Sequence, residues 1–387
     1  MSSNDVSKPR RRALRILGAV PPALFALPRH VLAQASGGDG EIRIGQSCQL
    51  SGPLSSLTKE IQDGAALYFR QVNARGGVHG RSIRVISKDD GYDPARAAAN
   101  ARSLIEEDGV IALFNVAGTP TTLAVLPVAR DHRIPLIAPF TGSGQLRAPF
   151  ERYVFNARAG YGEEIEKIVQ HLSVLGIAHV GVAHLNNSFG KGGVVAVQSA
   201  AQKTRISLVA TTPLEVDGKG LKEAAAEMAH GRPQAIILIT AGKITSDFIA
   251  AYQAIATGAQ FYALSVVSSR QLIDALGDRS KGVAIAQVMP YPWGGASELS
   301  REILGLAKAQ GIQVTYNHME GYVSAKLLVE GLKLAGQSPT PETLIRALEG
   351  LHALDLGGFI LHFSDHNHNG STYVELTIVG SEKHMVR

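Results

Sequence analysis

The chain has 387 residues, of which 45% are hydrophobic and 18% charged, a composition typical of a globular protein and not of a disordered or fibrous one. It carries 38 Lys and Arg against 33 Asp and Glu, a formal net charge of +5. A single cysteine, Cys48, excludes a fold held by internal disulfides. The length is sufficient for two domains, each with its own core.

Residues 1–35 have the pattern of an export signal. Four arginines between positions 10 and 15 precede an apolar run at 16–27, and residues 33–35 read Ala-Gln-Ala, a small-residue cleavage site. The apolar run is too short to cross a bilayer, which takes about 20 residues. We therefore predict a signal peptide, cleaved after Ala35, and a periplasmic protein. The adjacent arginines also resemble a twin-arginine signal, so the twin-arginine and general secretory routes both stay open.

The predicted cleavage removes the basic character of the chain. The leader holds six of the 38 basic residues and one of the 33 acidic residues, which leaves 32 of each in the mature chain. The sequence pI of about 9.2 therefore arises from the leader. We expect no nucleic-acid partner and no attraction to an anionic membrane surface.

The first part of the mature chain alternates short apolar strands with helical patterns. Asp93 and Pro94 are a helix start, with Asp at the N-cap and Pro at the first helical position. The strands are expected at 42–46, 82–88, 110–114 and 134–138, and the helices at 59–74, 93–108 and 121–132.

A second strand–helix series begins near Gly160. Residues 235–239 are continuously apolar, as expected of a strand buried on both faces of a parallel sheet. The alternation predicts βαβ units with right-handed crossovers. The remaining strands are expected at 178–183, 206–210 and 261–264, and the helices after Gly160 and at 189–203, 221–230 and 245–257.

The C-terminal part has a different pattern. A strand at 282–289 leads into prolines near 290, where the chain is expected to return to the first lobe. Helices follow near 297–310, 317–335 and 341–350. Residues 358–363 and 373–379, around a polar turn, predict a closing hairpin.

Four stretches together resemble one family of receptors. They are LSGPL at 50–54, NARGGVHG at 73–80, DDGYDP at 89–94 and NNSFG at 186–190. In their order and spacing the chain is similar to periplasmic solute-binding proteins of the leucine/isoleucine/valine-binding type, over nearly all of residues 41–380. Members of that family supply ABC importers.

The resemblance implies an α/β fold of two doubly wound lobes joined by three hinge crossovers. Lobe I would comprise 41–157 plus 290–358, and lobe II 160–286 plus 362–387, with crossovers near 157–160, 286–291 and 358–362. It also implies a small-molecule ligand in the cleft, hinge closure upon it and an ABC permease in the inner membrane as partner. A monomer is expected, without cofactor or metal.

In lobe I, the resemblance places candidate ligand contacts on two loops and one helix. The loop at 115–121 opens a helix, so its hydroxyls and free backbone N–H groups can hold a carboxylate; ordinary helix capping by Thr is the alternative. The expected contacts are Leu57, Gly118, Thr119, Phe140, Thr141 and Gly142.

In lobe II, the expected contacts are Tyr161, Phe189, Ala241 and Ser265. Two of them depart from the family pattern. Ser265 falls where the amino-acid binders carry an acid that pairs with the ligand ammonium, and an aromatic position falls on Ala241 or Gly242. Because an unpaired buried charge is costly, we hypothesise a ligand without an α-ammonium group, such as a carboxylate, aromatic acid or amide. Branched-chain amino acids remain in the candidate class.

Other functions receive less support from the residues. The context of Ser143 does not match a nucleophile elbow, and the first strand–helix junction lacks G-x-G-x-x-G. His362, His366 and His368 lack a zinc-type spacing. Asp89 and Asp90 are interpreted as a structural strand end. We expect no catalytic residue; a ligand-sensing partner of a membrane receptor and, less favoured, a secreted α/β enzyme are the alternatives.

Overall fold

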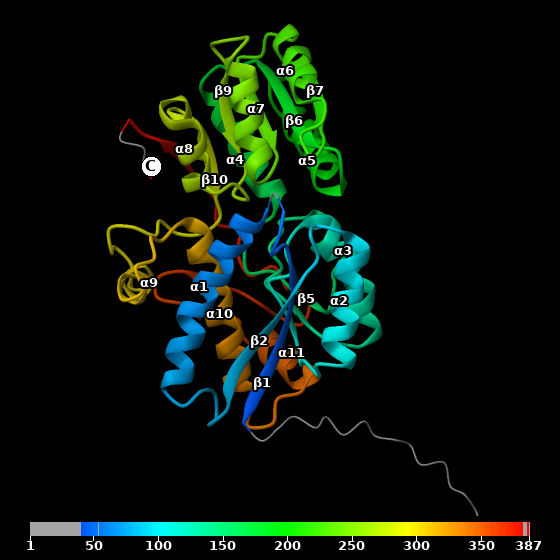
Figure 1. Cartoon of the computed structure of the whole chain (residues 1–387), viewed down its shortest axis with the longest axis vertical. Helices are drawn as coiled ribbons and strands as arrows, with labels where there is room; N and C mark the ends of the chain where they lie inside the picture. The colour runs from blue at the N-terminus through cyan, green and yellow to red at the C-terminus, as the bar shows by residue number, and fades with distance from the viewer. Residues whose placement is uncertain (1–39, 53, 382–384, 387) are drawn as a thin grey trace, which may run out of the picture. The chain divides into compact units, whose positions relative to one another are not determined.

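The computed structural model describes residues 40–52, 54–381 and 385–386. The predicted leader and its cleavage site, and Pro53 of the LSGPL stretch, lie outside the described residues. Two separate sheets, each flanked by helices, define the two lobes (Figure 1). The predicted α/β class with two doubly wound lobes is confirmed.

Lobe I is built on a five-stranded parallel sheet in the order β2-β1-β3-β4-β5. Its strands are β1 (Glu41–Cys48), β2 (Ser82–Asp89), β3 (Leu113–Phe114), β4 (Leu136–Ile137) and β5 (Val154–Phe155). Its helices are α1 (Ser55–Ala74), α2 (Pro94–Glu106), α3 (Thr119–Asp131), α9 (Glu298–Lys308), α10 (Tyr316–Leu334) and α11 (Pro341–Glu349).

Lobe II is built on a seven-stranded sheet in the order β14-β13-β10-β9-β8-β6-β7. The parallel strands are β6 (His179–Leu185), β7 (Ser207–Leu214), β8 (Ala235–Ile239), β9 (Gln260–Ala263) and β10 (Ala284–Gln287), and the antiparallel ones are β13 (Glu375–Val379) and β14 (Met385–Val386). The helices are α4 (Tyr161–Val174), α5 (Ser188–Ala201), α6 (Leu221–His230), α7 (Lys243–Gln253) and α8 (Ser269–Leu276).

Local sequence signals explain several of these elements. The Asp93 side chain accepts a hydrogen bond from Arg96 N and Pro94 begins α2, which confirms the predicted cap. All five residues of β8 are fully buried, as its continuous apolar run predicted for a strand with two covered faces.

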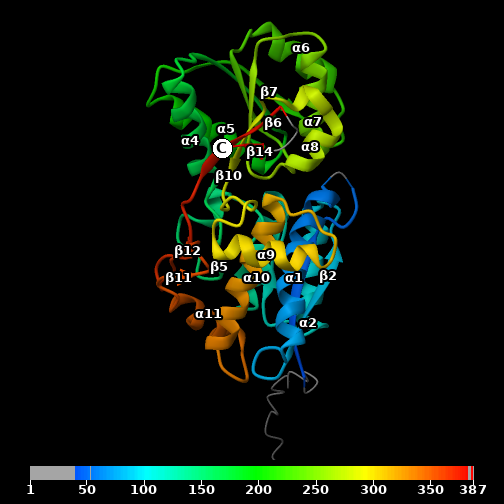
Figure 2. The ribbon, with the colours of Figure 1, turned by 90° about the vertical axis from the view of Figure 1, so that its left-hand side faces the viewer.

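Two parts of the sequence interpretation were wrong. The predicted hairpin of 358–363 with 373–379 does not form. Instead β12 (Ile360–Leu361) pairs with β11 (Leu354–Asp355), beside α11, while β13 joins the lobe II sheet (Figure 2). Helix α8 was not predicted at all, although its N-cap Ser268 accepts a hydrogen bond from Gln271 N.

The chain passes between the two sheets three times. Residues 156–160 connect β5 to α4, residues 288–297 connect β10 to α9, and residues 362–374 connect β12 to β13. The last of these segments contacts lobe I before it reaches lobe II, since the His368 ring stacks on Phe155 of β5. The residue boundaries proposed for the lobes remain predictions.

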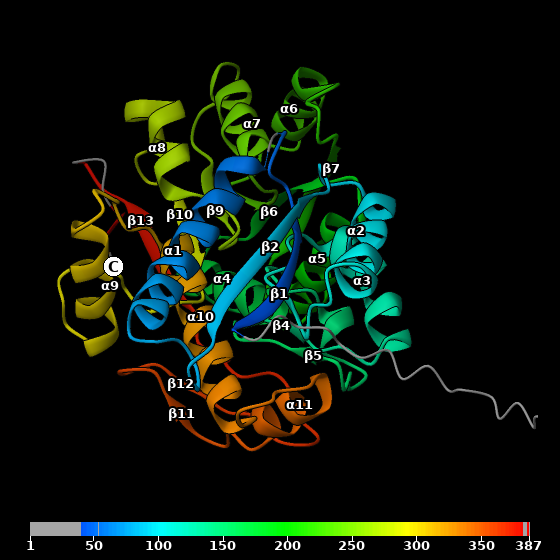
Figure 3. The ribbon, with the colours of Figure 1, turned by 60° about the horizontal axis from the view of Figure 1, so that its bottom comes forward.

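Helices α1 and α10 pack against each other through two glycines (Figure 3). A Cβ on Gly64 would lie 2.0 Å from His318 O, and a Cβ on Gly321 would lie 2.0 Å from Ile61 O. Neither obstacle is a flexible side chain, so the two helices would have to separate to admit a methyl group.

We therefore expect Gly64→Ala to lower the free energy of unfolding by about 1–3 kcal/mol, the range of an overpacked core. Gly305→Ala, in α9, is the matched control because its Cβ would meet nothing within 4 Å. That change should stabilise the protein by about 0.5–1 kcal/mol through helix propensity. Urea denaturation measures both; equal effects of the two changes would contradict the packing argument.

Candidate functional site

A narrow cavity lies where loops of the two lobes meet, and its volume is about 20 Å³. In lobe I its walls come from the segments that follow β1, β2, β3 and β4 and from the first turns of α1 and α3. In lobe II they come from α4, α5 and the segments that follow β8 and β9. This is the carboxyl edge of both parallel sheets, where α/β folds bind ligands. The lining residues are Gln49, Leu54, Leu57, Tyr92, Gly118, Thr119, Phe140, Tyr161, Phe189, Ala241 and Val266.

Most of the site residues expected from the sequence are brought together in this lining. Those at the cavity are Leu57, Gly118, Thr119, Phe140, Tyr161, Phe189 and Ala241. Thr141, Gly142 and Ser265 lie outside the lining. Their contact with a ligand, like that of the others, remains a prediction.

Sequence reasoning missed four lining residues: Gln49, Leu54, Tyr92 and Val266. Leu54 and Tyr92 belong to the stretches at 50–54 and 89–94 that carried the resemblance, and Gln49 precedes the first of them. Because these stretches follow the first two strands, their position at the carboxyl edge of the sheet could have identified Leu54 and Tyr92 as site residues. Val266 follows Ser265 directly, but only the polar residue of the two was predicted as a ligand contact.

Hydroxyl groups and a glycine shape the lobe I side of the cavity. The Thr119 and Thr141 hydroxyls hydrogen-bond each other at 2.7 Å, and both side chains are buried. Gly118, at φ +95°, is the N-cap of α3, and a Cβ there would lie 2.5 Å from Tyr92 Cε2. Thr119 does not cap the helix through its side chain; it is the first residue of α3 and lines the cavity.

Side chains of the two lobes touch directly around the cavity. Asn187 Nδ2 of lobe II donates to Tyr92 Oη of lobe I at 3.3 Å, and within lobe II the rings of Tyr161 and Phe189 lie 4.9 Å apart beside this bond. Burial raises the pKa of the Tyr92 phenol, which stays protonated. The arrangement is closed, because these contacts surround a space that holds about one water molecule.

A buried ionic cluster lies behind the aromatic wall of the cavity. The Arg158 guanidinium is 1% exposed and lies 5.4 Å from the centre of the Phe140 ring and 5.5 Å from that of Tyr161. It donates to Glu164 Oε1 at 2.8 Å and to Glu320 Oε1 at 3.2 Å. The cluster thus joins the first crossover to α4 in lobe II and α10 in lobe I.

Ser265 is part of this cluster. Its backbone N–H donates to Glu164 Oε2 at 2.8 Å, its hydroxyl donates to Glu164 Oε1 at 3.0 Å, and Arg158 donates to its hydroxyl oxygen. Ser265, at the position where the family carries the partner of a ligand ammonium, is therefore engaged in hydrogen bonds within the protein.

The electrostatic balance of the cluster favours charge on the arginine. Burial raises the pKa of Glu164 and that of Glu320, although the positive charge of Arg158 acts to lower both values. Burial also disfavours the charged guanidinium, but the two carboxylates outweigh it and the pKa of Arg158 is raised. Arg158 stays protonated, and neither carboxylate is available at the cavity surface.

The two carboxylates at 89–90 have structural roles. Asp90 is fully buried and accepts hydrogen bonds from Ser47 Oγ at 2.8 Å and Gln49 Nε2 at 3.3 Å. Asp89 accepts from the Ser51 hydroxyl at 2.5 Å, a bond that lowers the pKa of Asp89. Both hold the loop after β1 in place, in agreement with the structural interpretation.

Metal binding gains no support from the described part of the chain, in which no three His, Cys, Asp or Glu side chains gather in a metal-binding group. His368 instead stacks on Phe155, with ring centres 3.8 Å apart. It is 3% exposed, and burial lowers its pKa to about 4.

This depressed pKa predicts a pH-dependent stability. The unfolded histidine has a pKa near 6.5, so between about pH 6.5 and 4 the unfolded state holds more protons than the folded state. We expect the free energy of unfolding to fall by about 3 kcal/mol as the pH is lowered through that window. His368→Phe should remove this fall, whereas His366→Gln, at an exposed position, should keep it. Urea titrations at several pH values measure it; a fall that persists in His368→Phe would assign the effect elsewhere.

Within the described residues, no helix combines the length and apolar character needed to cross a membrane. Two α/β lobes with a cavity at the facing carboxyl edges of their sheets define a two-lobed ligand-binding protein of the hinge type. Residues 41–382 match the model of the periplasmic binding protein family, and the chain belongs to that family.

Individual relatives agree with this assignment. The chain is 23% identical over 352 residues to Leu/Ile/Val-binding protein homolog 8 of Brucella abortus, covering 85% of this chain and 86% of that one. It is similar to a substrate-binding periplasmic protein of Ralstonia solanacearum (TM-score 0.84, 30% identity, 88% and 98% covered). It is also similar to a possible leucine/isoleucine/valine-binding protein of Rhodopirellula baltica (TM-score 0.83, 26% identity, 90% and 96% covered).

Proposed function

We propose that this protein captures a small carboxylate without an α-ammonium group in the cavity between its lobes and delivers it to an ABC importer. The observation that carries the ligand class is the uncharged lining: the eleven described residues that form it include no Asp, Glu, Lys, Arg or His. The proposed ligands are aliphatic or aromatic acids.

The lining suits a molecule with one polar end. The Thr119 hydroxyl and the first turn of α3 offer hydrogen-bond donors to a carboxylate on the lobe I side. Leu54, Leu57, Phe189 and Val266 supply apolar surface for the rest of the ligand. An ammonium group would meet no carboxylate there, and burying it unpaired would cost several kcal/mol.

Entry of any such ligand requires the lobes to separate. The cavity of about 20 Å³ is far smaller than the roughly 300 Å³ at which drug-sized ligand sites begin. The Asn187–Tyr92 hydrogen bond would open with the lobes and re-form around the ligand, whereas the Tyr161–Phe189 pair would move with lobe II. Hinge motion about the three crossovers provides this movement.

Delivery, location and the absence of catalysis are further parts of the proposal. Membership of the periplasmic binding protein family supports a periplasmic location and an ABC permease as partner. The export pattern of residues 1–35 supports the same location.

A ligand screen followed by an uptake assay tests this function. Thermal-shift screening of small acids, amides and amino acids should find ligands that raise the melting temperature, and these should be recovered chemically unchanged. Cells lacking the gene should lose uptake of the ligand and regain it with the gene restored. Turnover of the ligand would overturn the binding function, and normal uptake without the gene would overturn delivery.

A further inference from the structure

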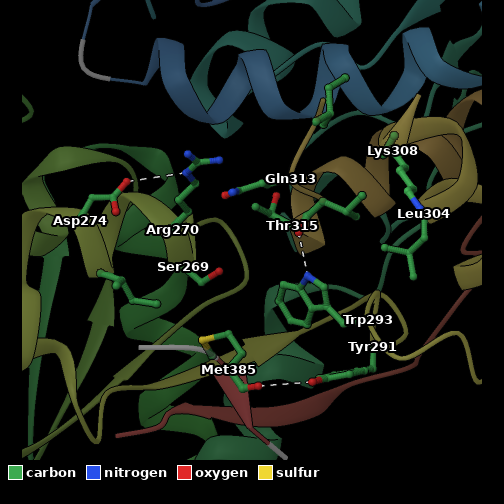
Figure 4. Close-up of a pocket in the computed structure, with 14 residues that line it drawn as sticks. Ser269, Arg270, Asp274, Tyr291, Trp293, Leu304, Lys308, Gln313, Thr315 and Met385 are labelled. Atoms are coloured by element: carbon green, nitrogen blue, oxygen red, sulfur yellow. Dashed lines mark hydrogen bonds and ion pairs between the residues drawn. The ribbon is translucent and has the colours of Figure 1, made fainter. Parts of the chain in front are cut away.

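An open groove lies apart from the cavity and has a volume of about 850 Å³, within the size range of small-molecule sites (Figure 4). It shares no lining residue with the cavity. Its walls come from α8 of lobe II, α9 and residues 312–315 of lobe I, the segment after β10, and β14. The lining residues are Ser269, Arg270, Ile273, Asp274, Tyr291, Trp293, Leu304, Ala307, Lys308, Ile312, Gln313, Val314, Thr315 and Met385.

The floor of the groove is a fixed aromatic surface. Trp293 Nε1 donates to Val314 O at 2.9 Å, and the Trp293 ring packs edge-on against Tyr291 at 5.1 Å and Tyr316 at 5.4 Å. Because its one polar atom is satisfied from within the protein, the indole ring offers apolar surface to a ligand. Leu304 and Met385 extend this surface on either side (Figure 4).

Two cations flank the floor from different lobes (Figure 4). Arg270, on α8, lies 3.7 Å from Asp274 in an exposed ion pair. Lys308, at the end of α9, is exposed and forms no ion pair with any described residue. Among the described residues of the lining, Asp274 is the one carboxylate, and Arg270 already faces it. Lys308 is therefore the stronger anchor for an anion.

We propose that this groove is a second binding site, for an amphipathic carboxylate whose apolar chain lies over Trp293 and whose carboxylate pairs with Lys308. The cation and the apolar floor together favour such a molecule over a neutral or cationic one. Since the lining includes residues of both lobes, a molecule bound there contacts both lobes at once. The site is independent of the ligand proposed for the cavity.

Trp293 makes the test specific, because it is the sole tryptophan of the chain. Decanoate below its micelle concentration should change the tryptophan fluorescence saturably, whereas decyltrimethylammonium should bind at least tenfold more weakly. Lys308→Gln should weaken decanoate binding about three- to tenfold, as expected for a partly exposed charge-assisted contact. Lys222→Gln, an exposed lysine on α6, is the matched control and should bind like the unchanged protein.

Further variants separate the groove from the cavity. Leu304→Ala, at a half-buried position of the lining, removes apolar surface from the groove without altering charge and should also weaken decanoate binding, whereas Thr119→Val, in the cavity, should leave it unchanged. The proposal is overturned by an absence of saturable binding, by equal binding of the cationic amphiphile, or by wild-type affinity in Lys308→Gln. Loss of decanoate binding in Thr119→Val would assign the molecule to the cavity and equally overturn the second site.

Discussion

Replacing Arg158 with methionine should lower the free energy of unfolding by about 3–5 kcal/mol, the cost of breaking a buried ion pair from one side. Methionine replaces the side chain only as far as Nε and leaves Glu164 and Glu320 without their shared cation, and both are almost fully buried. It also removes the guanidinium that lies over Phe140 and Tyr161, two walls of the cavity.

Two further variants test whether the loss of stability comes from the buried ion pairs of Arg158. Arg152→Met removes a half-exposed arginine from Glu342 and should cost no more than about 1 kcal/mol. Glu320→Gln keeps an acceptor for Arg158 and leaves one carboxylate per guanidinium, so its cost should fall between the two. Chemical denaturation measures all three. If Arg158→Met lowered the free energy of unfolding by less than Arg152→Met does, the cluster would not stabilise the fold.

Thr119→Val should weaken binding of the ligand found by the screen about 10- to 100-fold, since a hydrogen bond to a charged group contributes roughly 1.5–3 kcal/mol. Valine has the shape of threonine, so the change removes the Thr119 hydroxyl, the hydrogen-bond partner of Thr141, with little loss of packing. Calorimetry of the purified protein gives the dissociation constant.

The matched control for this prediction is Thr240→Val. Thr240 and Thr245 form an equally buried hydroxyl pair at 2.7 Å in lobe II, and neither lines the cavity. Both variants should lose similar stability, but Thr240→Val should keep its affinity. Equal loss of affinity in the two variants, or none in Thr119→Val, would remove Thr119 from the binding site.

Repeating local patterns explain why much of the fold was predictable. The apolar run of β8 and the Asp93–Pro94 start of α2 appear in the structure as expected, because burial on both faces and N-capping are set by neighbours in sequence. The partner of a strand is not set in this way. Residues 360–361 turn back at Gly357 and Gly358 to pair with β11, and alternation of side chains cannot distinguish that partner from β13.

The Arg158 cluster was not predictable for a related reason. Glu320 lies 162 residues beyond Arg158, and Ser265 lies 107 residues beyond it, so only the folded chain brings them together. In the sequence, Ser265 was interpreted as an open position in the cleft, whereas the structure shows its hydroxyl bonded to Glu164 and Arg158. The inferred absence of an ammonium partner now rests on the uncharged lining as a whole.

The most direct test of the proposed ligand class is calorimetry with matched pairs that differ in the α-ammonium group. Leucine with 4-methylpentanoate, and phenylalanine with 3-phenylpropanoate, keep the side chain constant while adding or removing that charge. In the pair whose side chain fits the cavity, we expect the acid to bind at least about 100-fold more tightly, because roughly 3 kcal/mol is lost in burying an unpaired ammonium. Tighter binding of either amino acid than of its acid would contradict the account.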